Sequence, residues 1–595
     1  MPEVDSLAIY AVGTESLVVA PLGRQWRIDA SPDDVLSSTV LAHLAALAGP
    51  AVRIRFDPHD VLVSSTDELL GGVHRATTGG RRAEDVTGWF FAGHWYRMRR
   101  DHAALRTAVD CLRATIPDAD LAAVLAGPAH RPAKPSIERA PTPKPGPGVL
   151  QRWENGTWVD HLLDPAPLVD PVTGILKRIV ARPAHPALPL GFVHWHAELP
   201  HLSSVDPHWQ PDPLAPAGYL TGADPAARAI ADDQPGLLSG LAHYCGAYLG
   251  QGQRHYASLT QLREAGEDAL DLRDWEPHDP ALHEEPGFPF IRFDIDQKLW
   301  WMAGKRGDKR CWVPLSLVHA GWMQADLPGL VAHNYHNLVG LQAGNTWDEA
   351  VERACAHVVA SDAVALWWAG GDRLPLAAVP PTVKQAWGEC ELKLTLLKVP
   401  STMKVPVVLA VVDDPAADIV TLGFAAHRDP DTAAELAVVE SLIQHASAQD
   451  LNSPESLIRD QGVAGLVPYD ERRRYRDAFG IDLRGLIDPM CHVQRALDPR
   501  VARAVRHRCL PSRDVTPAPV CDSVRAALAE QHELILLDVA TDRVRSAGMH
   551  VARAVVAGLA RIQPAAFPLD MTARFSRLAR QCAWSRQHRE PYPGW

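Results

Sequence analysis

Two histidine-containing stretches place metal-binding side chains at short spacing. HWHAELPH begins with His194 and His196, and His333 and His336 lie three residues apart further along. Residues two apart share one face of a strand, and imidazole nitrogen is a frequent ligand of divalent transition metals. A metal-binding pair at His194 and His196 is therefore one interpretation. We favour the other, a histidine-rich loop on the surface.

A helix that begins well but has an almost uncharged middle is predicted over residues 343–368. Thr346 is a good N-cap, and Glu349 three residues later completes a capping box. Apolar residues follow at helical spacing. The face formed by His357, Ala360 and Ser361 holds no carboxylate and no arginine. The start of this helix is well capped, whereas its middle lacks the charged side chains that catalysis or metal binding would use.

The bulk composition is that of a globular protein of two or three domains. The chain has 595 residues, of which 47% are hydrophobic and 22% charged, and its formal net charge is -12. Nucleic acid is excluded as the main partner, because phosphate binding needs a basic surface.

The cysteines and the apolar runs indicate in which cellular compartment the protein works. Nine cysteines are scattered without a Cys-x-x-Cys pair, which argues against a structural zinc site and for reduced thiols. The N-terminus has no basic segment leading into an apolar core, and no apolar run is long enough to cross a bilayer. We expect a cytoplasmic protein without membrane contact.

A proline-dense stretch divides the chain. Residues 127–148 are rich in proline and poor in large apolar residues, so they predict a semi-rigid linker. Residues 1–126 are then a small mixed α/β or winged-helix-like domain. Residues 149–595 are an α/β or α+β domain with a large core. Its predicted strands are 405–412, 533–540 and 550–559, and its predicted helices are 433–446 and 523–531.

Seven segments between about 165 and 595 resemble, in the expected order, the YcaO superfamily. The closest branch is that of the azoline-forming cyclodehydratases, which mature thiazole/oxazole-modified peptides. The segments are LVDPVTGILKRI (168–179), GLAHYCGAYLGQGQRHYASLTQLRE (240–264), DIDQKLWWMAGKRGDKRCWVPLSLV (294–318), the helix 343–368, VPVVLAVV (405–412) with GFAAHRDPDTAAELAVVESLIQ (423–444), DVATDRVRSAGMHVARAVVAGL (538–559) and the tail REPYPGW.

The resemblance implies an ATP- and magnesium-dependent reaction. An enzyme of this branch phosphorylates a peptide amide oxygen while a Cys, Ser or Thr side chain attacks, and the product is an azoline. Carboxylates would hold the magnesium, and cations would offset the triphosphate charge.

The motifs that supply these groups in relatives differ here. Two helical Glu-x-x-Glu-Arg patterns align with Ser239, Ala242 and His243 and with His357, Ala360 and Ser361. In the turn between them Leu338 and Val339 replace a polar pair, while Gly340, Gly344 and Asn345 remain. Four carboxylates and two arginines are thus absent together. Each lost charge-assisted hydrogen bond is worth about 1.5–3 kcal/mol, so we expect a degenerate ATP pocket, lined by Ser239, His243, Gly340, Gly344, Asn345, His357 and Ser361.

A few polar groups remain as candidates. Glu440, on the predicted helix that Asp429 caps, matches a glutamate that relatives keep. Pro591 and Pro593 match part of a proline-rich tail that reaches the active site in relatives. His243, His336 and His357 would converge in the family fold, as a repurposed metal site or, the interpretation we favour, as histidines that fill space.

The sequence thus predicts a degenerate YcaO-fold protein of ribosomal peptide natural product biosynthesis, such as bacteriocin maturation. It would be a non-catalytic partner or scaffold that needs no cofactor. Its partners would be a precursor's leader peptide, an active YcaO or dehydrogenase subunit, or a second copy of itself. The N-terminal domain occupies the place of a leader- or partner-binding domain. The alternative is an active cyclodehydratase that uses ATP and Mg²⁺, with Glu349 and Glu352 recruited to a rearranged site.

Overall fold

The computed structural model divides into two compact units, residues 1–178 with 200–205 and residues 179–199 with 206–595. Between residues 7 and 160 it describes the strands given below. Beyond them it describes residues 168–169, 175–176, 178–181, 187–199, 214–220, 234–247, 254–275, 278–285, 287–321, 327, 329–336, 338–460, 463–514, 517–569, 575–576, 580 and 590–594.

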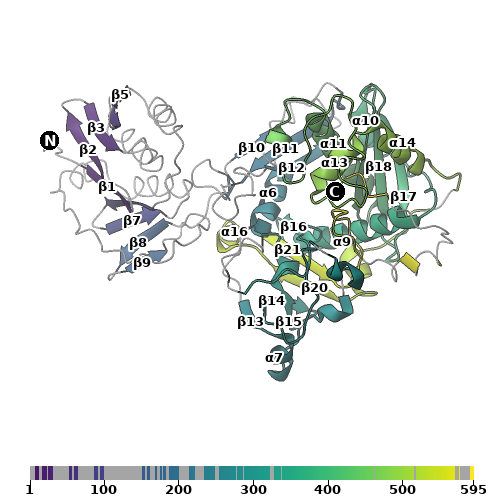
Figure 1. Ribbon diagram of the computed structural model, residues 1–595, viewed down its shortest axis with the longest axis horizontal. Helices are drawn as coiled ribbons and strands as arrows, with labels where there is room; N and C mark the ends of the chain where they lie inside the picture. The colour runs from purple at the N-terminus through teal and green to yellow at the C-terminus, as the bar shows by residue number, and fades with distance from the viewer. Residues whose placement is uncertain are drawn as a thin grey trace. The chain divides into compact units, whose positions relative to one another are not determined.

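The first unit contains a nine-stranded sheet of order β5-β4-β3-β2-β1-β6-β7-β8-β9, in which only β3 and β4 pair in parallel (Figure 1). Its strands are β1 (Leu7–Val12), β2 (Ser16–Leu22), β3 (Gln25–Ala30), β4 (Val52–Phe56), β5 (His59–Val63), β6 (Val86–Phe91), β7 (His94–Met98), β8 (Leu150–Glu154) and β9 (Thr157–Asp160). The proline-rich stretch 127–148 lies outside the described residues. Because β8 pairs with β7, sheet pairing resumes beyond that stretch.

The second unit begins with a three-stranded sheet, β10 (Arg178–Ala181), β11 (Phe192–Glu198) and β12 (Leu214–Leu220). Alternating side chains of β11 pack on two different helices. Val193 and Trp195 face α6 (Gln234–Ala247), where Gly236 lies close to Trp195, while Phe192 joins the core around α11 (Pro430–Leu451). The favoured interpretation of HWHAELPH as a surface loop was wrong, because its first residues belong to β11. Val193, Trp195 and Ala197 are buried apolar residues two apart, which is the period of a strand.

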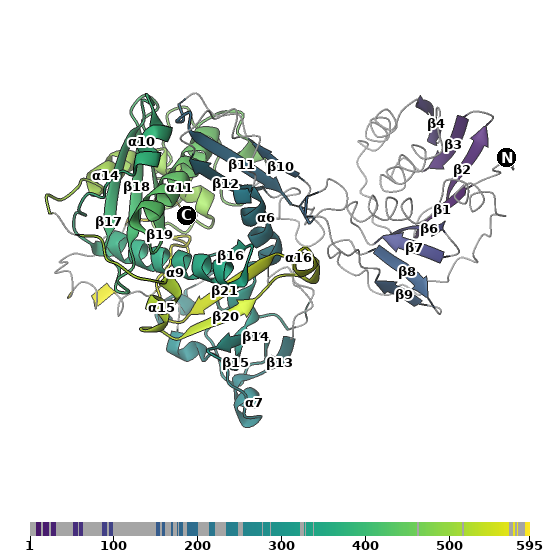
Figure 2. The same ribbon diagram turned by 180° about the vertical axis from the view of Figure 1, so that it is seen from behind.

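A six-stranded antiparallel sheet forms the next layer, in the order β13-β14-β20-β21-β16 with β15 paired to β14. Its strands are β13 (Arg254–Ala257), β14 (Leu299–Arg306), β15 (Lys309–Pro314), β16 (Leu341–Gly344), β20 (Leu534–Asp538) and β21 (His550–Val556). The strands predicted at 533–540 and 550–559 are β20 and β21. Figure 2 shows this sheet beside α6 on one side and α9 (Trp347–Gly370) on the other.

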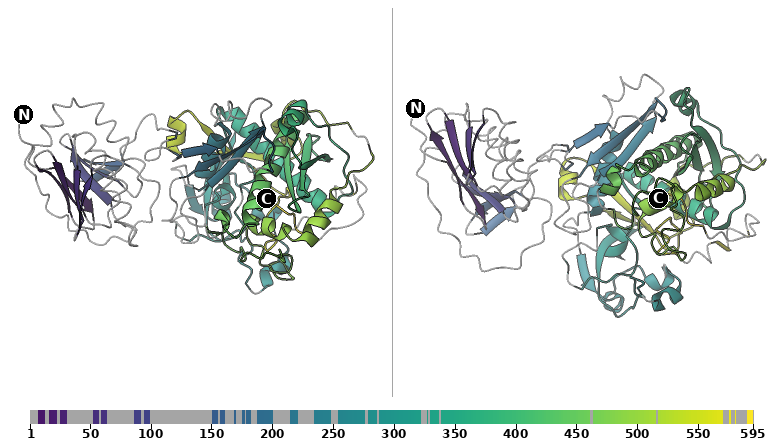
Figure 3. Two further views of the ribbon diagram at one scale, coloured as in Figure 1. Left: turned by 90° about the horizontal axis from the view of Figure 1, so that it is seen from above. Right: turned by 45° about the horizontal axis from the view of Figure 1, so that its top comes forward.

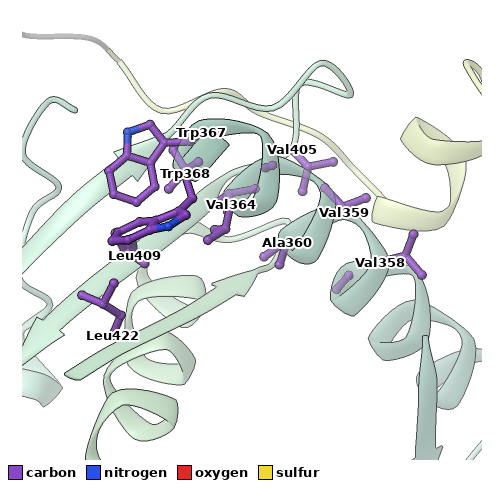
Figure 4. Close-up of a cluster of buried hydrophobic side chains, with 14 of the residues drawn as sticks. Val358, Val359, Ala360, Val364, Trp367, Trp368, Val405, Leu409 and Leu422 are labelled. Atoms are coloured by element: carbon purple, nitrogen blue, oxygen red, sulfur yellow. The ribbon is translucent and has the colours of Figure 1, made fainter. Parts of the chain in front are cut away.

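A second three-stranded sheet lies between α9 and α11 (Figures 1 and 3). It consists of β17 (Lys393–Val399), β18 (Val407–Asp414) and β19 (Ile419–Ala426). Odd-numbered β18 residues such as Leu409 pack on α9, and even-numbered ones such as Ala410 pack on α11. This is the pattern of a strand buried on both faces, which reads as a continuous apolar run. In Figure 4, Val364 and Trp367 of α9 lie in the same cluster as Leu409 and Leu422.

Shorter helices connect these layers. They are α7 (Leu259–Glu264), α8 (Leu315–Val318), α10 (Pro381–Trp387), α12 (Leu457–Asp460), α13 (Pro489–Ala496), α14 (Pro499–Arg508), α15 (Val524–Ala529) and α16 (Asp542–Ser546), with 3-10 turns η1 (Leu272–Trp275) and η2 (Pro280–Glu284). The helices predicted at 433–446 and 523–531 are α11 and α15. Within the described part of the chain, no helix combines the length and apolar character needed to span a bilayer.

Candidate functional site

The Gly-rich turn before α9 is shaped by close packing. Gly340 has φ +82°, and a Cβ there would lie 2.5 Å from the Ala554 carbonyl oxygen and 2.8 Å from Val358. The Ala554 amide donates to the Gly340 carbonyl at 2.8 Å, which ties the turn to β21. A Cβ at Gly344 would lie 2.6 Å from the Ala350 amide nitrogen. Both glycines are therefore required by the fold itself, whatever ligand the turn binds.

The start of α9 uses its polar groups for capping. Thr346 is the N-cap, as predicted, and its hydroxyl accepts from the Glu349 amide at 3.2 Å. The Glu349 carboxylate accepts from the backbone amide of Asn345 at 3.0 Å and from its side chain at 3.2 Å. The reciprocal bond of the capping box is thus displaced by one residue. Gln234 at the start of α6 donates to the Asn345 side chain at 3.0 Å, so one polar network joins the two helix starts.

The second acid of α9 is also engaged in capping. The Glu352 carboxylate accepts from the Val524 amide at 3.0 Å and from the Ser523 hydroxyl, at the beginning of α15. Arg353 lies 3.5 Å from Glu349 in an exposed i,i+4 ion pair. The two carboxylates that a rearranged magnesium site would recruit therefore already hold local structure together.

The middle of α9 carries structural contacts where the relatives' motif would carry charge. The Gln342 side chain donates to His357 Nδ1 at 3.1 Å. Ser361 is fully buried, and its hydroxyl accepts from the Ile562 amide at 3.2 Å. The neighbouring carboxylate of Asp362 accepts from the Ala560 amide at 2.7 Å. Ser361 and Asp362 thus anchor the segment that follows β21.

Burial keeps the three candidate histidines neutral. It lowers the pKa of His243, on α6, to about 4, and does the same for His336. The pKa of His357 is also lowered to about 4, by burial first and by nearby Arg553 second. His336 stacks on Tyr335, with ring centroids 4.3 Å apart. No group of three or more His, Cys, Asp or Glu side chains is arranged to hold a metal ion among the described residues.

The sequence analysis did not predict two arginines of the core region, Arg553, which is buried, and Arg561, which is half-buried. Arg553 on β21 donates to the Leu317 carbonyl at 3.0 Å, and burial lowers its pKa to about 9, helped by Arg561. Burial also lowers the pKa of Arg561 to about 10. The available signal was an arginine inside the apolar run HVARAVVAGL, since strands buried on both faces rarely carry charge. These guanidinium groups give this part of the core positive charge.

Glu440 lies on α11, where the helix passes very close to β19. A Cβ at Gly423 would lie 2.8 Å from the Glu440 backbone carbon, so no larger residue fits at that crossing. Burial raises the pKa of the Glu440 carboxyl to about 7. At neutral pH it is therefore partly protonated, a state suited to proton transfer but poor for holding a magnesium ion.

The C-terminal tail is inserted into the second unit. Trp368 at the end of α9 donates to the Glu590 carbonyl at 2.7 Å, and Arg495 lies 2.9 Å from the Glu590 carboxylate. Tyr592 is only 5% exposed, and its carbonyl accepts from His492 at 2.7 Å.

Tyr592 and Gly594, which lie beside the two prolines of the tail, contact α9, β19 and α11. The Tyr592 ring packs edge-on against Trp368 of α9 and Phe424 of β19. Gly594 touches the side chain of Gln444, one turn beyond Glu440 on α11. Pro591 and Pro593 flank Tyr592, and Pro593 is itself buried. The structure therefore brings the tail to α11. The candidates on α9, His357 and Ser361, instead contact Gln342 and the Ile562 amide.

The comparisons with known proteins give the class. The family model described as YcaO cyclodehydratase, ATP- and Mg²⁺-binding, matches residues 236–560, more than half of the chain. The chain belongs to the YcaO cyclodehydratase family. No curated protein matches it.

The chain is also similar to solved structures. A heterocyclase solved in complex with substrate and cofactor has 16% identity, with 99% of this chain and 76% of that chain covered and a TM-score of 0.53. YcaO from Methanopyrus kandleri bound with AMPPCP and Mg²⁺ has 14% identity, with 64% and 86% covered and a TM-score of 0.39. The E. coli microcin synthetase McbBCD complex has 9% identity, with 64% and 86% covered and a TM-score of 0.40. The first comparison bears out the expected mixed α/β YcaO-like fold.

Proposed function

We propose that this chain is a catalytically degenerate YcaO protein of thiazole/oxazole-modified peptide biosynthesis. It would act as a partner or scaffold that binds a precursor peptide or an active synthetase subunit, and ATP would not be its cofactor. The observation that carries the proposal is the state of α9. Both acids near its start cap helices, and the positions that align with the relatives' charged motif hold His357, Ala360 and Ser361.

The residues present do not fit magnesium-ATP in this pocket. Magnesium needs oxygen ligands in a near-octahedral arrangement, and neutral imidazoles such as His243 and His357 are poor substitutes. Freeing Glu352 for a metal would leave the hydroxyl of Ser523 and the first amide of α15 without their acceptor, at a cost of about 1–2 kcal/mol. Freeing Glu349 would undo the network at Asn345 in the same way. Rearrangement is therefore opposed by the same contacts that stabilise the helix start.

Calorimetric titration of the whole chain with magnesium-ATP tests the proposal. The expected result is no saturable heat up to millimolar nucleotide, with the same result for ATP alone. Saturable binding in the micromolar range overturns the proposal. In that case Glu352→Gln separates a recruited acid from a purely structural one, because only a magnesium ligand would change the nucleotide affinity without a matching loss of stability. Asp348→Asn, at an exposed acid one residue from Glu349, is the matched control.

A partner-binding assay tests the positive half of the proposal. Leader-containing precursor peptide, or an intact YcaO or dehydrogenase subunit, should bind in the absence of nucleotide. A peptide would add as a strand to an open sheet edge, a mode that uses backbone hydrogen bonds and needs no charged pocket. Binding that appears only when ATP is added would contradict a nucleotide-independent scaffold.

An active ATP-dependent cyclodehydratase is the second candidate, and the region of α11 favours it. Glu440 has its pKa raised to about 7, near the optimum for a general acid or base, and the proline-containing tail lies on the same helix. ATP hydrolysis that is stimulated by a Cys-, Ser- or Thr-rich precursor, and lost in Glu440→Gln, would establish this candidate. Azoline formation would appear as a loss of about 18 Da per ring in the mass of the peptide, one water for each cyclodehydration.

A further inference from the structure

His194 and His196 of β11 present their distal ring nitrogens to one point. Both residues lie on the strand face opposite Val193 and Trp195, which pack towards α6. Their Nε2 atoms are 3.1 Å apart, and the rings meet at 71° with centroids 4.5 Å apart. Two neighbouring imidazoles on one strand face can take many relative rotations, so convergence of the two Nε2 atoms is a specific arrangement.

The separation of the two nitrogens fits a shared metal ion. Zinc and similar ions bind imidazole nitrogen at about 2.0–2.1 Å, and two such bonds whose nitrogens are 3.1 Å apart enclose an angle of about 95–102°. That angle lies between the roughly 90° of a tetragonal site and the roughly 109° of a tetrahedral one. Tetragonal geometry with nitrogen and oxygen ligands is typical of Cu²⁺ and Ni²⁺.

The backbone around the pair is held in a sheet by a neighbouring strand. β11 pairs with β12 along its whole length, with His194 opposite Gly218 and His196 opposite Pro216. His194 is only 9% exposed, and its ring stacks on Phe192, which is itself held in the core of α11. His196 is half-buried. A preorganised pair binds a metal more tightly than the same residues in a loop, because little conformational entropy is lost on binding.

We infer that His194 and His196 form a two-histidine site for a divalent transition-metal ion, Cu²⁺ in preference to Ni²⁺ and Zn²⁺, with water completing the coordination. The order follows the general affinity series for nitrogen ligands. The ion would replace the contact between the two Nε2 atoms, and both rings would bind it in their neutral form. This site is independent of whether the chain binds nucleotide.

Titration of the whole chain with Cu²⁺, followed by electron paramagnetic resonance, tests the inference. The expected result is one saturable equivalent with two nitrogen ligands and micromolar or tighter affinity, and weaker saturation by Ni²⁺. His196→Gln should lower the Cu²⁺ affinity at least tenfold and remove the two-nitrogen spectrum. His194→Gln should do the same. His255→Gln, at an exposed histidine on β13, is the matched control and should bind as the parent does.

Two results would overturn the inference. One is a parent chain that shows no stoichiometric Cu²⁺ binding, which would leave the pair as an ordinary N–H···N hydrogen bond between neutral rings. The other is an unchanged affinity and spectrum in His196→Gln, which would place the bound copper elsewhere among the 27 histidines. Thermal unfolding guards against a misfolded variant, since Cu²⁺ should raise the melting temperature of the parent and of His255→Gln but not of His196→Gln.

Discussion

Helices α9 and α11 pack on opposite faces of the same three-stranded sheet, yet their polar residues have different roles. On α9, Glu349 and Glu352 take part in helix caps, and Ser361 anchors the segment that follows β21. On α11, Glu440 is half-buried with a raised pKa and lies near the inserted tail. These polar groups of α9 thus hold local structure together, whereas α11 carries a carboxyl whose protonation can change near neutral pH.

Under the proposed function, the fold keeps its architecture without the charged groups of one wall. The apolar residues of α9 fill the core between two sheets, and this packing does not depend on charged groups in the middle of the helix. We therefore expect substitutions in the core of α9 to change stability, and substitution of Glu440 on α11 to change how stability depends on pH.

The largest expected effect tests α9 as a packing element. Trp367 is fully buried, donates to the Asp372 carbonyl at 2.9 Å and lies under the guanidinium of Arg508. Trp367→Ala should lower the free energy of unfolding by about 3–5 kcal/mol, measured by urea denaturation. Leu436→Ala on α11, where the side chain is 43% exposed, is the control and should cost less than about 0.5 kcal/mol. Similar losses in both variants would contradict the central position of α9.

A pH-dependent effect tests Glu440. Its pKa is raised from 4.5 to about 7 in the folded state, so folding binds a proton between these values and the carboxyl destabilises the protein as pH rises through that window. Glu440→Gln removes this penalty. The stability of the variant relative to the parent should therefore increase by about 3 kcal/mol from pH 4 to pH 8. A pH-independent difference between the two proteins would show that the carboxyl is not desolvated.

A medium effect tests the insertion of the tail. His492 joins two segments, through the Tyr592 carbonyl at 2.7 Å and the Ala565 amide at 3.0 Å. His492→Ala should cost about 2 kcal/mol, because two buried backbone groups lose their partner. Hydrogen exchange of residues 590–594 should become faster. His507→Ala, at an exposed position on α14, serves as the control. Unchanged exchange in the tail would mean that other contacts, such as Trp368 with Glu590, suffice to hold it.

The smallest effect tests the cap of α9. Thr346→Ala removes the acceptor of the Glu349 amide and should cost about 1 kcal/mol, while Asn345→Ala removes only exposed hydrogen bonds and should cost about half as much. Both values come from thermal unfolding. If Asn345→Ala instead abolished a measurable nucleotide affinity, the comparison between the two helices would have to be reversed.

The regular elements of the second unit were predictable from short-range patterns. Asp429 was expected to cap a helix, and it does cap α11 through the amides of Asp431 and Thr432. The runs 405–412, 533–540 and 550–559 were recognised as strands because buried strands are apolar and β-branched. The boundaries differ by a few residues, since propensity does not fix where a ladder of hydrogen bonds ends.

The contacts of the site were not predictable in the same way. The partners of Glu349 and Glu352 depend on where the turn before α9 and the start of α15 come to lie, and Ser523 is far away along the chain. The insertion of the tail likewise depends on Trp368 and His492, which short-range patterns do not connect to Tyr592. The prediction of a loop at His194 was wrong, because the apolar period of two at Val193, Trp195 and Ala197 outweighs the polar character of the histidines between them.

The close approach at Gly340 and Gly344 has a consequence for how such chains are recognised. Neither position tolerates a β-carbon, since Ala554 and Val358 occupy the space at one and the backbone of Ala350 at the other. Steric exclusion would preserve these glycines in any lineage that keeps the sheet and helix together, with or without a nucleotide. Glycines at this turn therefore indicate the fold of the chain. They do not indicate whether it is catalytic, which depends on the side chains around the turn.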